Sequence, residues 1–448
     1  MLWRLAMASR NLSINVEFIT RVEGHGHIVI DMDEGVLKSC QLKVVEAPRF
    51  FEALLVGRSI FEAQHITSRI CGICACGHSL ASIQAAEDAI GFIPSEQTVR
   101  LRKLLLHLEN LDSHILHIYL LAAPDLVGVK SFMGLMKDHS GAVRRALRMK
   151  KYCNDACDIL VGRHVHPISC VVGGFTKLPG LKRLKEMHAL LTLIREDLPP
   201  TVELVSSLKF PDFVRETEYV ALVNDSGEYP MLIGDVGSSD GVRKPKREYR
   251  SITNEFIVPH SSAKHTRLSR SSYAVGALAR FNLNHDKLHP KAKELAASLG
   301  LKPVCANPYL NSAAQLVECV HCSEEAISIV EHFMANGLDQ TEVALGGLNE
   351  KGAIPVRAGN GVGCVEVPRG ILFHNYEVDD RGIITSANCI IPTGQNLQNI
   401  EDDMEKLVPE ILDRSDEEIT LALEMLVRAY DPCISCSTHF LEVKFVNR

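Results

Sequence analysis

Hydrophobic and polar residues alternate with the period of a β-strand near the start of the chain and again near its end. The N-terminal alternation predicts three short strands, over 15–19, 27–31 and 37–45. The turn-like stretch at 23–26 separates the first two, so their loop should present Arg21, Glu23 and His25 in one direction. Glycine turns punctuate a second β-rich region, predicted over 359–363, 367–374 and 383–392.

Between these regions, apolar residues recur at intervals of three and four, which predicts helices. The predicted helices span 48–57, 59–67, 80–90, 95–123, 135–160, 181–197, 313–336 and 401–430. Pro124 should end the fourth helix and Pro199-Pro200 the sixth, because proline disrupts helical hydrogen bonding. Residues 211–270 are polar, and we expect them to leave the core. The pattern therefore predicts a mainly α fold with small peripheral β-sheets, an α+β architecture.

Composition narrows the class of protein. The 448 residues are 46% hydrophobic, which is ample for a globular core. A formal net charge of −7 argues against nucleic acid, although 243–250 and 264–270 form a basic patch suited to a solvated loop or an acidic partner. No apolar run reaches the roughly 18 residues of a membrane span, and the N-terminus has too short an apolar core for a signal peptide. We therefore expect a soluble, cytoplasmic protein with no membrane span.

Fourteen cysteines at irregular spacing indicate metal chemistry and reduced thiols rather than a disulfide framework. Two C-x-x-C words stand out, Cys71-Gly-Ile-Cys74 and Cys433-Ile-Ser-Cys436, more than 350 residues apart. Together they offer four thiolates to one soft cation. A structural zinc site is the simplest reading, yet zinc knuckles normally pair within tens of residues. A redox dithiol is a further reading of either word alone.

Three histidines and one further cysteine are other candidate metal ligands, and each has a structural alternative. His107, His114 and His117 fall broadly on one face of a predicted helix, where they form either a zinc site or core histidines. Cys76 is either a packed small residue or a spare oxidisable ligand.

The words around the cysteines resemble both signatures of the nickel–iron hydrogenase large, catalytic subunit. These words are Arg69-Ile-Cys-Gly-Ile-Cys with His78, and Asp431-Pro-Cys-Ile-Ser-Cys-Ser-Thr-His439. Further similar words lie at 21–25, 163–174, 273–280, 367–370 and 390–393. The resemblance is greatest to the cytoplasmic, cofactor-coupled branch. There, electrons pass to NAD(P), a deazaflavin or a heterodisulfide through other subunits.

This resemblance implies reversible heterolytic cleavage of dihydrogen and assigns the metal ligands. Nickel would be held by Cys71, Cys74, Cys433 and Cys436, with Cys74 and Cys436 bridging to an iron that carries cyanide and carbon monoxide. The cysteine that accepts the proton should be terminal, since bridging sulfurs have committed lone pairs, and we favour Cys433. Glu23 would then relay the proton outward.

The resemblance also assigns the surroundings of the metals. Arg369 and Thr393 would donate to cyanide, while Pro368, Ile391 and Pro392 would wall the carbon monoxide. Asp125 and Asp431 would form a polar canopy with Arg369, although Arg369 and Asp431 could equally be a plain structural ion pair. Magnesium would be bound by Glu52, His439 and the backbone carbonyl of Cys389.

Partners and processing follow from the same resemblance. The chain has no spare cysteine cluster with ferredoxin spacing, so electrons require a small subunit with iron–sulfur clusters and further electron-transfer subunits. A nickel chaperone and a maturation protease would act on it, the protease cutting after His439. A single large catalytic domain is expected over 1–448, divided into a sheet lobe (1–46), a helical core (47–208), a peripheral excursion (209–270), a return with the second metal loop (271–439) and a removable tail (440–448). Rival readings are a structural zinc protein, a hydrogen sensor and a respiratory-complex subunit of the same fold.

Overall fold

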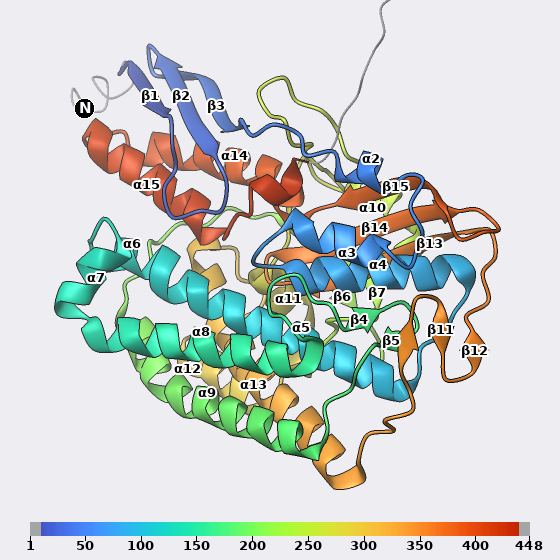
Figure 1. Cartoon of the computed structure of the whole chain (residues 1–448). Helices are drawn as coiled ribbons and strands as arrows, with labels where there is room; N and C mark the ends of the chain where they lie inside the picture. Colours follow the sequence, from blue (N-terminus) through green and yellow to red (C-terminus); the bar gives the residue numbers. More distant parts are fainter. Residues whose placement is uncertain (1–9, 439–448) are drawn as a thin grey trace, which may run out of the picture.

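The computed structural model describes residues 10–438 and has a helical core with small sheets around it (Figure 1). Its α-helices are α2 (Phe51–Leu55), α3 (Ala63–Thr67), α4 (Ala75–Ile90), α5 (Glu96–Leu116), α6 (Ala123–Leu126), α7 (Phe132–Asp138), α8 (Ser140–Val161), α9 (Leu181–Ser207), α10 (Arg250–Thr253), α11 (Ala277–Asn284), α12 (Pro290–Ser298), α13 (Asn311–Asn336), α14 (Pro392–Glu410) and α15 (Asp416–Ala429). The mainly α, α+β prediction is confirmed.

Helices α5, α8, α9 and α13 pack on one another and form the helical layer. Leucine, isoleucine and cysteine side chains of these helices share one large buried cluster with both cysteine words. Helix α5 begins where the sequence indicates: the side chain of Ser95 accepts a hydrogen bond from the backbone N–H of Thr98. The cysteine words are thus anchored in the largest hydrophobic core of the molecule.

The two ends of the chain meet in a second, smaller core. Strands β1 (Leu12–Val16), β2 (Gly26–Asp33) and β3 (Val36–Val44) form an antiparallel sheet in that order. Figure 1 shows this blue sheet beside the red helices α14 and α15, and their apolar side chains form one buried cluster. The loop between β1 and β2 is therefore held next to the segment that follows α15.

The first cysteine word is positioned by close packing of α4 on a second sheet. Strands β13 (Gly359–Val367), β14 (Gly370–Val378) and β15 (Ile384–Ile390) are antiparallel in sequence order. A Cβ atom added at Gly361 would lie 2.1 Å from the backbone nitrogen of Ala89, and one at Gly363 would lie 1.9 Å from the carbonyl oxygen of Ala81. Only glycine lets the helix backbone approach the strand this closely.

The remaining sheets are small. Strands β6 (Glu218–Val223), β7 (Asp235–Ser238), β8 (Arg243–Lys244) and β9 (Tyr273–Ala274) form a four-stranded sheet in the order β8-β7-β6-β9, in which β6 and β9 are parallel. The shorter strands are β4 (Cys170–Val171), β5 (Gly174–Phe175), β10 (Ala344–Leu345), β11 (Leu348–Asn349) and β12 (Gly352–Ala353). Against expectation, β6 is almost wholly buried and packs with apolar residues of β13 and β14. This part of 209–270 is a core element, because hydrophobic residues fill both faces of the short strand.

Several predicted helix ends were wrong. Helix α9 continues through Pro199 and Pro200 to Ser207, because the buried positions Ile194, Leu198 and Val205 keep their helical spacing on both sides of the prolines. The helix predicted to end before Pro124 continues as a π-helical turn, His117–Ala122, and then as α6, where Pro124 occupies the first turn that tolerates it.

Two further boundaries differ from the prediction. The helix predicted over 401–430 is two helices, and Ser415 begins the second with a capping box to Glu418. The first strand begins three residues earlier than expected, at Leu12, and ends at Val16.

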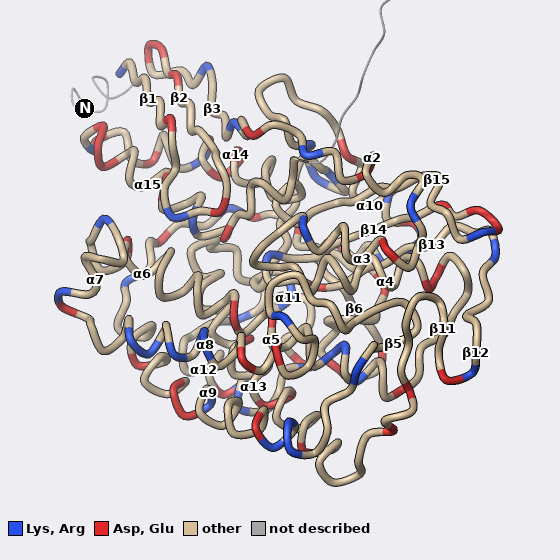
Figure 2. The backbone as a smooth tube through the Cα atoms, viewed as in Figure 1, with Lys and Arg blue, Asp and Glu red and all other residues tan. Residues whose placement is uncertain are grey.

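Positively and negatively charged residues are interspersed along the chain. Figure 2 shows Lys and Arg interleaved with Asp and Glu along the whole tube. The basic patch predicted from sequence is paired internally: Arg243 with Asp225, and Arg270 with Asp240. Within the described part of the chain, none of the helices is long and apolar enough to span a bilayer.

Candidate metal centre

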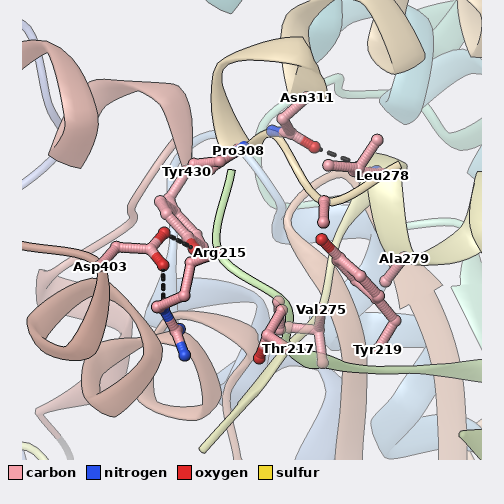
Figure 3. A pocket seen from close by; sticks show the side chains of 12 residues that line it. Arg215, Thr217, Tyr219, Val275, Leu278, Ala279, Pro308, Asn311, Asp403 and Tyr430 are labelled. Atoms are coloured by element: carbon pink, nitrogen blue, oxygen red, sulfur yellow. Dashed lines mark hydrogen bonds and ion pairs between the residues drawn. The ribbon is translucent and has the colours of Figure 1, made fainter. Parts of the chain in front are cut away.

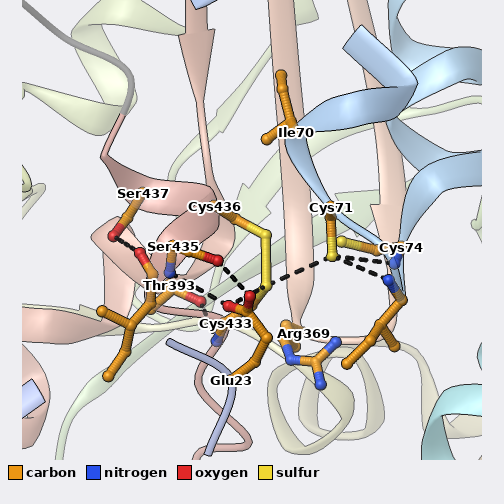
Figure 4. The surroundings of a disulfide bond; sticks show 12 residues. Glu23, Ile70, Cys71, Cys74, Arg369, Thr393, Cys433, Ser435, Cys436 and Ser437 are labelled. Carbon is orange, nitrogen blue, oxygen red and sulfur yellow. Dashed lines mark hydrogen bonds between the residues drawn. A yellow bond between two sulfur atoms is a disulfide. The ribbon is translucent and has the colours of Figure 1, made fainter. Parts of the chain in front are cut away.

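Four cysteine sulfurs converge where the start of α4 meets the segment after α15, as the sequence predicts. Those of Cys71, Cys74, Cys433 and Cys436 all lie within 4.8 Å of one another, and all four residues are buried. The sulfurs of Cys71 and Cys433 are 3.5 Å apart although the residues are 362 positions apart in sequence. Figure 4 shows one pair on the helix side and the other on the segment after α15.

Local structure explains where each pair sits. A 3-10 turn, Ser68–Ile70, delivers Cys71 in extended conformation, and Cys74 is the N-cap of α4. The positive end of that helix therefore lies at the first pair, and the backbone N–H groups of Ile73 and Cys74 point at the Cys71 sulfur. The second pair follows α15 and precedes or lies within the 3-10 turn Ser435–Ser437.

Arg49 and Glu23, both from the N-terminal part of the chain, connect to the two cysteine words. The guanidinium of Arg49 donates to the carbonyl oxygens of Ile70, at 2.5 Å, and of Ser435, so it links both cysteine words. Glu23 pairs with Cys433 as a parallel backbone bridge, and its carbonyl accepts the N–H of Ile434 at 2.8 Å. Arg49 was not identified from the sequence, where a lone arginine before a short helix gives no signal.

The geometry fits a thiolate-bound metal ion. A sulfur–metal bond of about 2.3 Å places two sulfurs on one ion no more than about 4.6 Å apart. The sulfurs of Cys71 and Cys433, 3.5 Å apart, fall within that span, and all four sulfurs lie within 4.8 Å of one another. Cys433 and Cys436 form a disulfide in this structure (Figure 4). Ligation of a metal requires both as thiolates.

The two thiols of the first cysteine pair differ in pKa. The sulfur of Cys71 accepts the backbone N–H groups of Ile73 and Cys74, each at 3.2 Å. Its hydrogen bond with Cys74 holds the pKa of Cys71 below the ordinary thiol value, while the same bond and burial hold the pKa of Cys74 well above it. Cys71 is thus the more acidic thiol of the pair.

Glu23 lies directly beside the second pair. The sulfur of Cys433 lies 3.1 Å from its carboxylate, and the backbone N–H of Ser435 donates to the same carboxylate oxygen at 3.2 Å. The hydroxyl of Ser435 donates to the other oxygen. The prediction that Glu23 lies at a cysteine sulfur agrees with this contact. The anchoring role of Ser435 was not foreseen.

Arg369 and Asp431 form a buried ion pair at the same site. Arg369 donates to the Asp431 carboxylate at 2.8 Å and to its carbonyl at 2.6 Å, and it also faces the hydroxyl of Ser113 at 3.4 Å. Arg280 donates to the carbonyls of Val367 and Pro368 and so fixes the turn that carries Arg369. The side chains of this pair are at most 3% exposed, so the guanidinium is held rigidly over the cysteines.

Asp125 does not join this group. Its carboxylate pairs with Arg428 at 3.0 Å and with Arg21, and among the described residues it makes no hydrogen bond or ion pair with Arg369. Of the two residues predicted to form a canopy with Arg369, Asp431 therefore pairs with it and Asp125 does not. Asp125 instead links α6 to Arg428 of α15 and to Arg21 in the loop before Glu23. These partners are distant in sequence, so the pairing could not be predicted from the sequence.

Two of the three predicted wall residues lie at the start of α14, and the third, Pro368, is buried in the turn between β13 and β14. Ile391 is the N-cap of α14 and Pro392 its first residue, and both are buried. The hydroxyl of Thr393 accepts the backbone N–H of Cys433 at 2.9 Å, which leaves its own hydrogen to donate.

The predicted magnesium set is described only in part. Glu52 accepts the backbone N–H of Cys389 at 2.8 Å and the side-chain amide of Asn388 at 3.0 Å. His439 lies outside the described residues, so the set stays a prediction.

The three-histidine zinc reading is wrong. His114 bonds Glu318 at 2.8 Å, and His117 bonds Gln315 at 2.6 Å and a backbone carbonyl of α15. These are core histidines on separate partners, and no described cluster of metal donors includes them. Cys76 is buried with its sulfur 3.8 Å from the carbonyl of His164, outside the four-sulfur cluster, which agrees with the packed reading.

A small cavity of about 20 Å³ is lined by Tyr430, Asp403 and Arg215, among other residues (Figure 3). The Tyr430 hydroxyl donates to Asp403 at 2.6 Å and accepts from Asn399 at 2.6 Å, and Asp403 also pairs with Arg215. The volume holds about one water molecule and no substrate. The hydrogen bonds to Asp403 and Asn399 anchor Tyr430, the residue that directly precedes Asp431.

The cluster and its surroundings define a metalloprotein whose centre is built from both ends of the chain. Comparison with known proteins then gives the family. A family model described as nickel-dependent hydrogenase matches residues 49–144 and 238–439, and one described as HoxL-like matches 13–47. The chain belongs to the nickel-dependent hydrogenases, a family whose centre contains nickel and iron.

Individual relatives are similar to this chain over nearly its whole length. The chain is 35% identical to the alpha subunit of sulfhydrogenase 1 of Pyrococcus furiosus, over 98% of this chain and 100% of that one. It is 30% identical to a subunit of the F420-non-reducing hydrogenase vhc of Methanococcus voltae, over 95% and 94%. Among solved structures, an NAD+-reducing [NiFe]-hydrogenase is similar with a TM-score of 0.83 and 26% identity, over 96% and 100%. The Ni-Fe-Se hydrogenase of D. vulgaris Hildenborough is similar with a TM-score of 0.73 and 25% identity, over 96% and 100%.

Proposed function

We propose that this chain is the large, catalytic subunit of a nickel–iron hydrogenase that cleaves and forms dihydrogen. The observation that carries the proposal is the convergence of four buried sulfurs from the two C-x-x-C words. Nickel would be held by Cys71, Cys74, Cys433 and Cys436, with Cys74 and Cys436 shared with iron. When bound, such a pair supplies the soft, electron-rich centre needed to polarise dihydrogen, which has neither charge nor dipole.

Cys433 and Glu23 are the proposed proton carriers. The sulfur of Cys433 would accept the proton that leaves dihydrogen. Glu23 would pass it outward, since its carboxylate lies 3.1 Å from that sulfur, within direct transfer distance. Ser435 holds both carboxylate oxygens, so the acceptor stays oriented between turnovers.

The residues above the cysteines suit an iron that carries cyanide and carbon monoxide. Arg369 and Thr393 would donate hydrogen bonds to cyanide nitrogens, supported by the rigid hold on Arg369 and the unused hydroxyl hydrogen of Thr393. Apolar Pro368, Ile391 and Pro392 would line the carbon monoxide side, where no hydrogen bond is required. Glu52, the Cys389 carbonyl and His439 are the proposed magnesium ligands.

The electrons require partner proteins. Both relatives are named as hydrogenase subunits, which supports a heteromeric complex with a small iron–sulfur subunit, together with further electron-transfer subunits. The buried free thiols support a reducing compartment such as the cytoplasm. A nickel chaperone and a protease that removes 440–448 would complete maturation.

Metal analysis and infrared spectroscopy of the anaerobically purified complex test this function. We expect nickel and iron in the chain, with absorption bands in the cyanide and carbonyl region. Zinc in place of nickel, with no bands in that region, would refute the hydrogenase assignment and restore the structural zinc reading.

A further inference from the structure

A second group of metal-binding side chains lies away from the cysteines. His260 and His265 belong to the segment between α10 and β9, and Glu401 lies on α14. One donor atom from each of the three lies within 4.8 Å of the other two. Glu401 is eight residues beyond Thr393, which places it about 12 Å further along the helix axis.

The loop that carries both histidines has a fixed backbone. His265 and Phe256 exchange two backbone hydrogen bonds of 2.9 Å each. Ser262 is tied to β3, because its N–H donates to the Val44 carbonyl at 2.9 Å and its hydroxyl donates to the Glu46 carbonyl at 2.7 Å. The imidazoles are therefore presented to α14 by a preorganised loop.

The donors already face one another. Nε2 of His260 lies 2.8 Å from one carboxylate oxygen of Glu401, and Nδ1 of His265 lies 3.9 Å from the other. The backbone N–H of Leu42 donates at 2.8 Å to the Glu401 oxygen nearer His260 and so orients the carboxylate. His265 and Glu401 are buried, whereas the side chain of His260 is 17% exposed and gives an ion or water access to the site.

Electrostatics leave this carboxylate without a compensating cation. Glu401 makes no ion pair with Lys or Arg among the described residues. Burial, with further repulsion from Asp402 and Glu405, raises its pKa to about 8. Burial lowers the pKa of His265 to about 4, and burial together with Lys43 lowers that of His260. The imidazoles are thus neutral near pH 7, the form that binds metals.

One polar atom of the cluster has no hydrogen-bond partner among residues 10–438. This atom is the buried Nε2 of His265, whereas the Nδ1 of the same ring lies 3.1 Å from the side-chain oxygen of Gln398. A buried polar atom without a partner is costly, so the site is incompletely satisfied by protein groups alone.

We propose that His260, His265 and Glu401 bind a zinc ion that fastens the 256–266 loop to α14. Two imidazoles and one carboxylate form a ligand set that zinc accepts, with a fourth position left for water. With a pKa of about 8, Glu401 is mostly protonated near pH 7, so the ion would displace that proton and then balance the charge of the carboxylate. Sulfur ligands, which dominate the nickel centre, are absent from this donor set.

Such an ion would also brace the nickel centre from one side. The carbonyl oxygen of Lys264, next to His265, would be 3.2 Å from a Cβ added at Gly394, in the first turn of α14. That turn contains Thr393, whose hydroxyl holds the backbone of Cys433. Fastening the loop therefore limits movement of the turn that positions the second cysteine word.

The competing explanation is a simple hydrogen bond in which His260 and Glu401 share a proton and no metal binds. To distinguish the two, the intact complex is stripped with a chelator that leaves nickel in place, then incubated with zinc chloride, desalted and analysed for metals. His260→Ala and Glu401→Gln are compared with the wild type. His188→Ala is the matched control, because His188 forms a 2.9 Å pair with Glu331 on the surface without a third donor.

We expect a single zinc ion per chain in the wild type and the control, and background zinc in both site variants, with nickel content unchanged. Zinc X-ray absorption should show nitrogen and oxygen neighbours at about 2.0–2.1 Å, whereas zinc misplaced among the cysteines would show sulfur at about 2.3 Å. Failure of the wild type to retain zinc would overturn the proposal. So would zinc with sulfur neighbours, or equal zinc in the wild type and Glu401→Gln, which preserves side-chain shape.

Discussion

Replacing Glu23 with glutamine removes a proton acceptor while keeping its shape. The carboxylate lies 3.1 Å from the Cys433 sulfur and accepts from both the N–H and the hydroxyl of Ser435. An amide can keep the N–H bond through its oxygen and can donate to the hydroxyl through its nitrogen. We expect a change in folding stability of about 1 kcal/mol or less, the net worth of a neutral hydrogen bond.

The effect on proton transfer should be far larger. A positioned general acid–base group contributes about 10²–10⁴-fold to rate, which corresponds to about 3–5 kcal/mol in the barrier. Exchange of isotopes between dihydrogen and deuterated water reports this step without the electron acceptor. We expect Glu23→Gln to lower the exchange rate by about 10²-fold or more while nickel and iron contents stay at the wild-type level.

Glu46→Gln is the matched control, since Glu46 contacts the same loop but not a sulfur. Its carboxylate accepts the backbone N–H of His25 at 2.9 Å. Near-normal exchange is expected in this variant. If Glu23→Gln exchanged as fast as the wild type, Glu23 would have no place in the proton path, and Cys433 would need a different acceptor.

Three further substitutions test the surroundings of the centre. Asp431→Asn leaves the buried charge of Arg369 without its counterion and should cost about 3–5 kcal/mol in denaturant unfolding; an unchanged midpoint would mean that the pair is solvated. Tyr430→Phe removes the hydroxyl that donates to Asp403 and should cost about 1–3 kcal/mol in the same assay, with no loss expected if water replaces it. Burial raises the pKa of Glu366 to about 7, so the folded state holds a proton that the unfolded state releases above about 4.3. This group therefore reduces stability as pH rises from about 4.3 to 7, by at most about 1.4 kcal/mol per pH unit. Glu366→Gln should flatten that slope in unfolding midpoints measured across this range, and an unaltered slope would contradict the assignment.

The sequence predicted most elements of the fold, and its errors have identifiable causes. Helix α9 passes two prolines because tertiary burial outweighs a local penalty of about 3 kcal/mol. The break between α14 and α15 was missed although Ser415 and Glu418 form a capping-box word that signals a helix start. Strand β6 was missed because its neighbours are polar and its own hydrophobic run is short.

Some features of the metal centre were also predictable from the sequence, and others were not. Convergence of the four sulfurs followed from the two cysteine words, and the contact between Glu23 and Cys433 agrees with the role assigned to that loop. Arg49 could not be identified, because its function depends on two carbonyls from opposite ends of the chain. Asp125 was misplaced for the converse reason: an acidic residue near the right helix carries no information about which arginine it meets in space.

X-ray absorption at the nickel edge, on the complex purified without oxygen, tests the central claim most directly. The account predicts one nickel per chain with a shell dominated by four sulfur neighbours, two contributed by each end of the polypeptide. Cys433→Ser should remove one of them if nickel still loads. A shell of nitrogen and oxygen neighbours, or one with sulfurs from a single cysteine pair, would contradict it.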